Sequence, residues 1–506
     1  AAGGAAAAAG GVPLMVVGEL AESAELLVLG GGPGGYVAAI RAAQLGRQVT
    51  LIERAGAAGL GGVCLQVGCV PSKALIELAE AAARTREAEG MGLSAERVEV
   101  SLSRFQAWRE ELCRGLTRGV GQLLQVAGVK VVHGEARFNR PDRVAVRTPE
   151  DKAVFFEFEQ AIIATGSRDR GLPGLPVDGG RVLDSTAALA LSEVPATVVV
   201  VGAGYIGLEL ATALRKLGTA VTLVEAEARI LPWLDASLTA PVMHRLRRLG
   251  IEVRLARTAE RLDGEHLLML TPDGTEDRIP APLVLVTAGR EPNTDQLGLA
   301  AVGLELGSGG LLPVGGDMRV EGDERIAAIG DVVAGPARAH KASAQALVAA
   351  EALSGKPSGY EPAVVPIVIF SDPEIATVGL GEGEAHELGM DVRVATFPLA
   401  ASGRAAILGA RDGFTRLVMD AASDRIVGVH VVGPRATELA AGGALAIEMM
   451  ASAADLAGVM HPHPTLSEGL HEAAEMLLGQ PIHVSAPAGS KLDDTNLSSP
   501  LVGRKL

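Results

Sequence analysis

Two of the three cysteines of this 506-residue chain lie in one glycine-rich stretch, residues 61–73, which reads GGVCLQVGCVPSK. Cys64 and Cys69 are five positions apart, which on a regular helix separates their Cα atoms by roughly 7.5 Å of axial rise. A disulfide tolerates only about 4.4 to 6.8 Å between Cα atoms, so a bond here requires a distorted turn. The neighbouring glycines permit that turn at little steric cost. Because strained, accessible disulfides are labile, the pair is predicted to be a redox-active disulfide.

The residues around the pair indicate how it is held. Pro71 suits the first turn of a helix, which would place Cys69 near a positive dipole end that favours its thiolate. Two other interpretations remain open: two small buried apolar residues, or half of a zinc site. The stretch has no further Cys or His at close spacing, which disfavours zinc. So few cysteines are typical of an intracellular protein, and Cys113 is expected to be an unpaired buried thiol.

A second candidate cluster is HPHPTLSE, residues 461–468. His463 and Glu468 can form a base and the carboxylate that orients it, in a loop held by prolines. Taken alone, the motif is explained better by capping or by a surface histidine pair, and an HxH metal site is a third possibility. Dithiol exchange needs a proton acceptor, however, and the chain has ten histidines, which favours the base. His471 is predicted to be an exposed helical residue.

Two segments, residues 25–53 and 197–225, are predicted to be βαβ units that bind dinucleotides. Each runs from an apolar strand through G-x-G-x-x-G and a helix to a second strand that ends in an acid 23 positions after the first glycine. The glycines allow a pyrophosphate to approach a helix N-terminus, and the acid can hold a ribose hydroxyl. The motif residues are Gly30, Gly32, Gly35 and Glu53, then Gly202, Gly204, Gly207 and Glu225. An ordinary α/β turn could explain one unit, but two with identical spacing predict two dinucleotides.

The formal charge of −15 disfavours nucleic acid or an anionic membrane surface as the main partner. Residues 1–18 lack charge but are Ala and Gly without a basic start, so they are predicted to be a linker rather than a signal or a span. No other stretch is expected to cross a membrane.

Together these motifs resemble those of the dihydrolipoamide dehydrogenases, within the pyridine nucleotide disulfide oxidoreductase family. The resemblance covers about residues 24–482: GGVCLQVGCVPSKAL resembles the family's redox stretch, HPHPTLSE its base motif, AIGD its second flavin motif, and ATGS the segment between the flavin and nicotinamide domains. It implies an α/β fold with two Rossmann-like dinucleotide-binding domains and a C-terminal α+β dimerisation domain. The expected parts are a linker (1–22), an FAD-binding domain (23–175), an NAD-binding domain (176–295), a central segment completing the FAD site (296–360), the dimerisation domain (361–482) and a flexible tail (483–506).

The resemblance also assigns the cofactor sites. Residues implied for FAD are Gly30, Gly32, Gly35, Glu53, Gly134, Thr165, Gly166, Ser167, Asp331, Ala337, Ala339 and His340. Residues implied for NAD are Gly202, Gly204, Gly207, Glu225 and Gly289, with Lys73 and Glu209 paired where the nicotinamide would stack on the flavin. Glu225, with Glu227 close behind, suits the free ribose hydroxyls of NAD and repels a 2'-phosphate.

The implied activity is oxidation of protein-bound dihydrolipoamide with reduction of NAD+, as the E3 component of 2-oxo acid dehydrogenase complexes. The catalytic residues would be Cys64, Cys69, His463 and Glu468, with the last two serving the cysteines of the partner subunit in a homodimer. The implied partners are a lipoyl domain and a basic subunit-binding domain of an acyltransferase core, in the cytoplasm, with no nucleic acid and no membrane.

The sequence departs from the family pattern at Val63 and Gln66, which replace the common Thr and Asn beside the disulfide. Two alternatives remain: a related NAD(P)H-dependent reductase of another disulfide or of a metal ion, and a flavoprotein whose main role is structural within a multienzyme complex.

Overall fold

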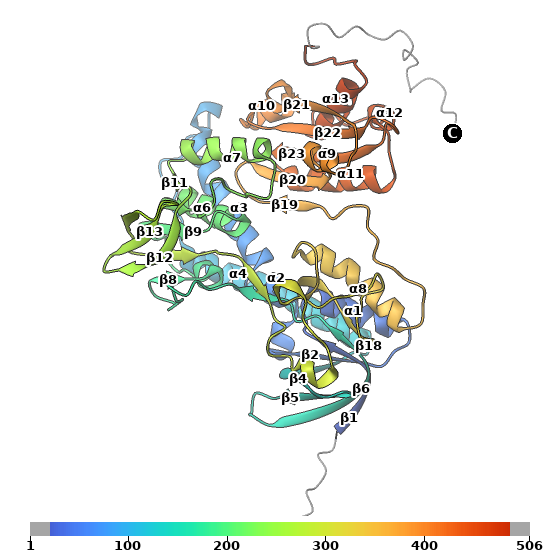
Figure 1. Cartoon of the computed structure of the whole chain (residues 1–506). Coiled ribbons are helices and arrows are strands. Elements are labelled where there is room, and N and C mark those ends of the chain that lie inside the picture. Colours follow the sequence, from blue (N-terminus) through green and yellow to red (C-terminus); the bar gives the residue numbers. More distant parts are fainter. Residues whose placement is uncertain (1–20, 486–506) are drawn as a thin grey trace, which may run out of the picture.

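The computed structural model describes residues 21–485 and confirms the mixed α/β fold class (Figure 1). The first strand begins at Ala21, so most of the predicted linker and nearly all of the predicted tail lie outside the described residues. The strands form three main groups, each with its own helices.

The first sheet has the order β17-β18-β6-β1-β2-β3 and is mainly parallel. Its strands are β1 (Ala21–Leu29), β2 (Val49–Glu53), β3 (Lys130–His133), β6 (Ala153–Ile163), β17 (Arg319–Val320) and β18 (Asp323–Ala328), and β4 (Glu135–Arg140) and β5 (Arg143–Arg147) extend it as a hairpin. Helices α1 (Pro33–Gln44) and α8 (Ala339–Leu353) pack against each other beside it. The central strand β1 is apolar throughout its second half because both faces of the sheet are covered. Ala327 pairs with Ile162, so the segment after residue 318 returns to this sheet.

The second sheet is fully parallel, with the order β11-β10-β9-β15-β8. Its strands are β8 (Val182–Leu183), β9 (Thr197–Val201), β10 (Ala220–Val224), β11 (Glu252–Arg254) and β15 (Val284–Val286), and its helices are α5 (Ser185–Leu189), α6 (Tyr205–Leu217) and α7 (Ala236–Arg248). A three-stranded antiparallel sheet of β12 (Thr258–Asp263), β13 (His266–Leu270) and β14 (Glu276–Pro280) lies beside it. The antiparallel pair β7 (Ser167–Asp169) and β16 (Arg290–Pro292) joins the first and second units.

The third sheet is antiparallel, with the order β19-β20-β23-β22-β21. Its strands are β19 (Ile367–Ile369), β20 (Glu374–Gly379), β21 (Val392–Pro398), β22 (Phe414–Asp420) and β23 (Ile426–Gly433), with helices α9 (Glu382–Glu387), α10 (Gly403–Ile407), α11 (Ala436–Glu448), α12 (Ala453–Ala457) and α13 (Glu468–Leu477). Adjacent residues of β20 face opposite ways: Ile375 packs in one core with α6, and Ala376 packs in another with α11 and α13. The third sheet therefore separates α13 from the second unit.

Helices α2 (Gly62–Gln66), α3 (Cys69–Glu87) and α4 (Leu102–Val126) belong to the first unit in sequence. By length and composition alone, Gly62–Met91 could cross a membrane, which the sequence analysis did not anticipate. In the structure Leu75 and Ala79 of α3 are buried in the core that contains Leu208 and Leu214 of α6, which explains the apolar composition.

Candidate active site

The predicted redox pair lies where two helices meet. Cys64 is in α2 and Cys69 is the first residue of α3, and the helical path breaks between them. Gly61 (φ +89°) and Gly62 (φ +57°) take left-handed conformations that larger side chains resist, whereas Gly68 does not. Gly61 and Gly62 therefore provide the expected freedom on the N-terminal side of Cys64, and at Gly68, between the cysteines, a Cβ would lie 2.8 Å from the Val63 carbonyl oxygen. Both cysteines are thiols in this structure, and Cys113 is free and buried as predicted.

The two thiols share one hydrogen bond, and their pKa values separate. Donation of this bond to Cys69, together with burial, raises the pKa of the Cys64 thiol far above its usual range. The same bond lowers the pKa of Cys69 to about 7, against burial and with help from the Lys73 ammonium. Cys69, at the positive end of α3, is therefore the thiol that ionises first, and Cys64 is the one that keeps its proton.

Lys73 and Glu209 form an ion pair, as predicted from the sequence, and this pair connects α3, α6 and the segment at Phe370. Lys73 Nζ of α3 lies 2.7 Å from Oε2 of Glu209 on α6, whose side chain is only 4% exposed. The backbone N–H of Phe370 donates to Glu209 Oε1 at 3.0 Å, and Lys73 Nζ lies 4.6 Å from the centre of the Phe370 ring. Sequence reasoning missed Phe370, which carries no motif signal because its contribution is a backbone N–H.

The first glycine turn has the form that a dinucleotide requires. Gly30 has φ +103°, and a Cβ on Gly35 would lie 1.8 Å from the Gly30 carbonyl oxygen. A Cβ on Gly32 would meet only Gly62 Cα, at 3.9 Å, so the backbone at the start of α1 is open to a close ligand. Glu53 Oε2 accepts the Gly31 N–H at 2.7 Å, which holds the carboxylate beside the turn. These residues fit the adenosine and pyrophosphate half of FAD.

The other residues assigned to FAD lie around the carboxyl ends of β3, β6 and β18. Gly134 N–H donates to the Glu53 carbonyl at 3.1 Å, and a side chain there would clash with Val146. Ser167 Oγ donates to Asp331 Oδ2 at 2.6 Å, which joins the ATGS and AIGD motifs. Thr165 Oγ1 donates to the Asn293 carbonyl at 2.8 Å, next to Gly166.

The segment from Ala337 leads into the N-terminus of α8 at Ala339, where free N–H groups favour anions. The ring of His340 does not turn back to this site but contacts the Pro366 carbonyl, with Nε2 at 2.9 Å. Any contribution of His340 to FAD would therefore come from its backbone.

The second glycine turn opens into a cavity of about 770 Å³. Of the residues assigned to NAD, Gly202, Gly204, Glu225 and Gly289 line it, whereas Gly207 is pressed against the Gly202 carbonyl and is a packing residue. Glu225 repeats the role of Glu53, because its Oε2 accepts the Ala203 N–H at 2.6 Å. The size and donor set fit a nicotinamide dinucleotide.

Four residues that sequence reasoning missed also line this cavity: Tyr205, Arg257, Arg290 and Arg338. Arg338 lies over the Tyr205 ring, 4.5 Å from its centre. Arg290 forms an ion pair with Asp169 at 2.5 Å and donates to Ser167 Oγ at 2.9 Å, so it ties the two units together. Its position in the GREPN run, directly after a predicted strand, was the signal available in the sequence.

His463 and Glu468 form the predicted pair. His463 Nδ1 lies 2.8 Å from Glu468 Oε1, and the Thr465 N–H donates to Glu468 Oε2 at 2.7 Å. Burial pushes the pKa of Glu468 upward, but these two hydrogen bonds outweigh it and leave the pKa below its usual value. The carboxylate therefore remains charged at neutral pH and fixes Nδ1 as the donor, with Nε2 left free to accept a proton.

The pair lies far from the cysteines of its own chain. Figure 1 shows α13 beyond the third sheet, on the side away from α2. The His463 side chain is 78% exposed and faces no cysteine that this subunit could supply.

The prediction that His471 is exposed is wrong. It lies on α13 but is half-buried, because the His461 ring packs 6.1 Å away and Glu475 approaches its Nε2 at 4.0 Å. Near it, Glu472 is buried and accepts from His483 Nδ1 at 2.7 Å. His483 also helps to lower the pKa of Glu468, a contribution that the sequence did not indicate.

Comparison with known proteins identifies the family of the chain. Residues 24–346 match the family described as pyridine nucleotide-disulphide oxidoreductase, and residues 365–474 match the dimerisation domain of the same family. The chain belongs to the pyridine nucleotide-disulphide oxidoreductases. It is 46% identical over 473 residues to a dihydrolipoyl dehydrogenase of Geobacillus stearothermophilus, covering 93% of this chain and 99% of the relative. A dihydrolipoyl dehydrogenase of Bacillus subtilis is 43% identical over 475 residues, covering 93% of this chain and 100% of the relative.

Two solved structures have a similar fold. LpdA from Mycobacterium tuberculosis superposes with a TM-score of 0.83 at 29% identity, covering 90% of this chain and 99% of that one. The flavoprotein disulfide reductase RclA from Escherichia coli shares the fold, with a TM-score of 0.79 at 24% identity and coverage of 89% and 99%. As a member of this family the protein is an oxidoreductase that uses FAD and NAD(H), and it carries the family's dimerisation domain, which makes it a homodimer.

Proposed function

We propose that the protein is a dihydrolipoyl dehydrogenase, which oxidises the dihydrolipoyl group of a partner protein and reduces NAD+. The observation that carries this proposal is the thiol pair at the junction of α2 and α3, in which the pKa of Cys69 is lowered and that of Cys64 is raised. Because their pKa values differ, Cys64 would be the sulfur that the substrate attacks and Cys69 the sulfur that leaves as a thiolate. The relatives in Geobacillus stearothermophilus and Bacillus subtilis, which match over nearly their whole length, bear the name of this activity.

The proposed reaction begins at the oxidised pair. A substrate thiol gives its proton to Nε2 of His463 of the partner subunit, and the resulting thiolate attacks Cys64 Sγ. The bond between Cys64 and Cys69 breaks, and Cys69 leaves as a thiolate because its pKa is low. The second substrate thiol then displaces Cys64, which closes the substrate disulfide and leaves Cys64 with a proton. FAD, which the first glycine turn and Glu53 would hold, would supply the two-electron chemistry that links the reduced cysteines to NAD+.

The homodimer would complete the site. Within one subunit the third sheet separates His463 from Cys64, and a base 78% exposed to solvent has no reacting group beside it. Pairing of two dimerisation domains would bring each His463 and Glu468 pair to the cysteines of the other subunit. We therefore assign catalytic roles to Cys64, Cys69, His463 and Glu468, and cofactor roles to the two glycine turns with Glu53, Glu225, Lys73 and Glu209.

The proposed setting is the cytoplasm, as the E3 component of 2-oxo acid dehydrogenase complexes. A lipoyl domain would be the substrate, and the acidic chain, with a formal charge of −15, would suit a basic subunit-binding domain of the acyltransferase core. The limits proposed for the domains are those expected from the sequence.

Steady-state assays test the proposal. We expect turnover with dihydrolipoamide and NAD+, and at least about a hundredfold lower kcat/KM with NADH and either oxidised glutathione or mercuric ion. Dimers with Cys64→Ser in one subunit and His463→Gln in the other should retain one working site. No turnover of dihydrolipoamide by the flavin-loaded dimer would end the proposal. No activity in this mixed dimer would reject the shared site, because each unshared site would carry one of the two changes.

A further inference from the structure

The rim of the NAD cavity carries an arginine, Arg257, beside two acidic residues that form no ion pair with it. Glu225, Glu227 and Arg257 all line the cavity. The backbone brings them together, because Arg257 N–H donates to the Glu225 carbonyl and Ala256 N–H to the Glu227 carbonyl, both at 2.9 Å. The backbone of Arg257 therefore lies beside Glu225, the acid that would hold the adenosine ribose.

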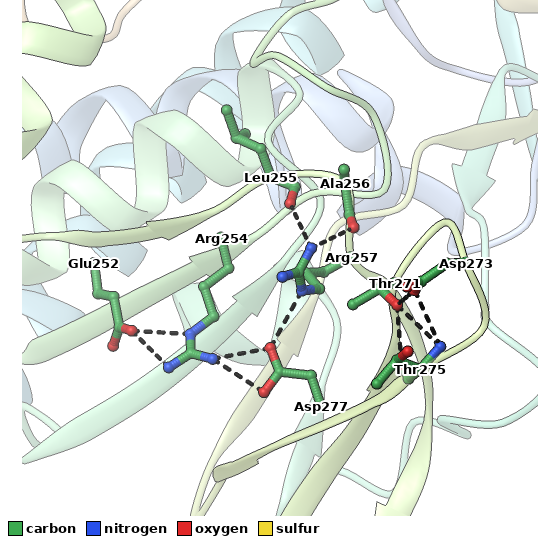
Figure 2. Close-up of polar contacts among 9 residues, drawn as sticks. All are labelled: Glu252, Arg254, Leu255, Ala256, Arg257, Thr271, Asp273, Thr275 and Asp277. Carbon is green, nitrogen blue, oxygen red and sulfur yellow. Dashed lines mark hydrogen bonds and ion pairs between the residues drawn. The ribbon is translucent and has the colours of Figure 1, made fainter.

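The Arg257 side chain is held by other groups. Its Nε donates to Asp277 Oδ2 at 3.2 Å, and its Nη1 donates to the Ala256 carbonyl at 2.9 Å. Arg254 reaches the same carboxylate, with Nη1 at 3.0 and 3.2 Å from its two oxygens. Figure 2 shows both guanidinium groups converging on Asp277, which lies on β14 rather than on the dinucleotide-binding unit. Burial would raise the pKa of Asp277, but the two arginines hold it below its usual value, so the carboxylate is charged.

We propose that Asp277 is a specificity-determining residue for the nicotinamide nucleotide: it keeps Arg257 engaged, so that the guanidinium of Arg257 does not bind a 2'-phosphate. Arginine is the side chain best suited to bind phosphate. Here the backbone N–H of Arg257 donates to the carbonyl of Glu225, the acid that would hold the ribose. With Asp277 in place, the rim presents the charges of Glu225 and Glu227, which reject NADP+. Asp277 acts through Arg257 and does not touch the nucleotide. The inference rests on the NAD-dependent function proposed above.

The test removes the charge of Asp277 and keeps its shape. In Asp277→Asn the guanidinium of Arg257 is released, and we expect the KM for NADP+ to fall about fivefold, which corresponds to ~1 kcal/mol for one exposed charge pair. The KM for NAD+ should stay within about twofold. The matched control is Asp273→Asn in the neighbouring turn of Figure 2, where Asp273 accepts from Thr271 and Thr275 and contacts no arginine among the residues drawn. The control should leave both KM values unchanged.

A binding measurement separates recognition from turnover. Calorimetry with 2',5'-ADP and 5'-AMP compares ligands that differ by the 2'-phosphate alone. Asp277→Asn should tighten 2',5'-ADP about fivefold and leave 5'-AMP unchanged, and adding Arg257→Ala should cancel the gain. Arg257→Ala alone should leave the ratio of the two affinities unchanged, because its guanidinium is already engaged.

Two results would overturn the inference. One is an Asp277→Asn protein that binds the two ligands in the same ratio as the Asp273→Asn protein. The other, which does not depend on the folding of Asp277→Asn, is a selective loss of 2',5'-ADP binding in Arg257→Ala alone. If the unaltered protein bound neither 5'-AMP nor NAD+, this result would instead contradict the proposed function.

Discussion

The Lys73 ammonium should set how readily Cys69 ionises, and replacing it tests the electrostatics of the site. Lys73 lies one helical turn after Cys69 on α3, a spacing that places side chains about 5–6 Å apart. At an effective dielectric constant of 20, one charge at 6 Å contributes about 3 kcal/mol, or about 2 pKa units. Lys73 is 30% exposed and is partly neutralised by Glu209, so we expect about half of this. In Lys73→Met the pKa of Cys69 should therefore rise from about 7 by ~1 unit.

The assay is the pH dependence of Cys69 alkylation by iodoacetamide in the dithiol-reduced protein, with the modified peptide identified by mass spectrometry. Because the thiolate is the reacting form, the rate should rise with pH and level off above the pKa. In Lys73→Met the midpoint should move up by ~1 unit, and the rate at pH 7 should fall about fivefold. Lys356→Met, at an exposed position, is the control and should not shift the midpoint.

Glu209→Gln should shift the pKa of Cys69 in the opposite direction, because the charge of Glu209 opposes ionisation of Cys69. The midpoint should move down in this variant. An unchanged midpoint in Lys73→Met, or an upward shift in Glu209→Gln, would refute the assignment of the low pKa to this pair.

Three further predictions concern the two halves of the reaction and the flavin site. Cys64→Ser should abolish dihydrolipoamide turnover but keep the yellow colour of bound flavin, as checked by assay and visible spectrum. Glu468→Gln should lower dihydrolipoamide turnover by roughly 10²-fold, because His463 loses its orienting carboxylate at 2.8 Å, while reduction of dye acceptors by NADH continues; equal loss in both assays would contradict this. Gly35→Ala should lower the flavin content of the purified protein, because its Cβ would lie 1.8 Å from the Gly30 carbonyl oxygen; a full complement of flavin would show that the turn can open without loss.

The local parts of the fold and site were predictable because they depend on short-range patterns. The two G-x-G-x-x-G turns follow from spacing, and the structure places the acid at the end of each second strand on the N–H after the first glycine. The break between Cys64 and Cys69 also follows from local glycines. These features need no knowledge of distant residues.

The rest depends on contacts between segments distant in sequence. Phe370 contributes a backbone N–H to Glu209 across 161 positions, which no side-chain motif signals. Asp277 reaches Arg257 only because β14 folds beside the second unit. The prediction that His471 is exposed failed because the ring of His461, from a preceding loop, packs beside it. Packing of this sort is set by tertiary structure, which a single sequence does not reveal.

The most direct test of the account is an anaerobic titration of the purified flavin-loaded protein with dihydrolipoamide, followed by visible spectroscopy. If electrons enter through the cysteine pair, a long-wavelength band from the Cys69 thiolate beside the flavin should appear after one equivalent and should be lost below about pH 7, where Cys69 binds a proton. Cys69→Ser should show no such band. A flavin that is reduced by dihydrolipoamide at the same rate in Cys69→Ser, or a spectrum that stays unchanged in the unaltered protein, would contradict the account.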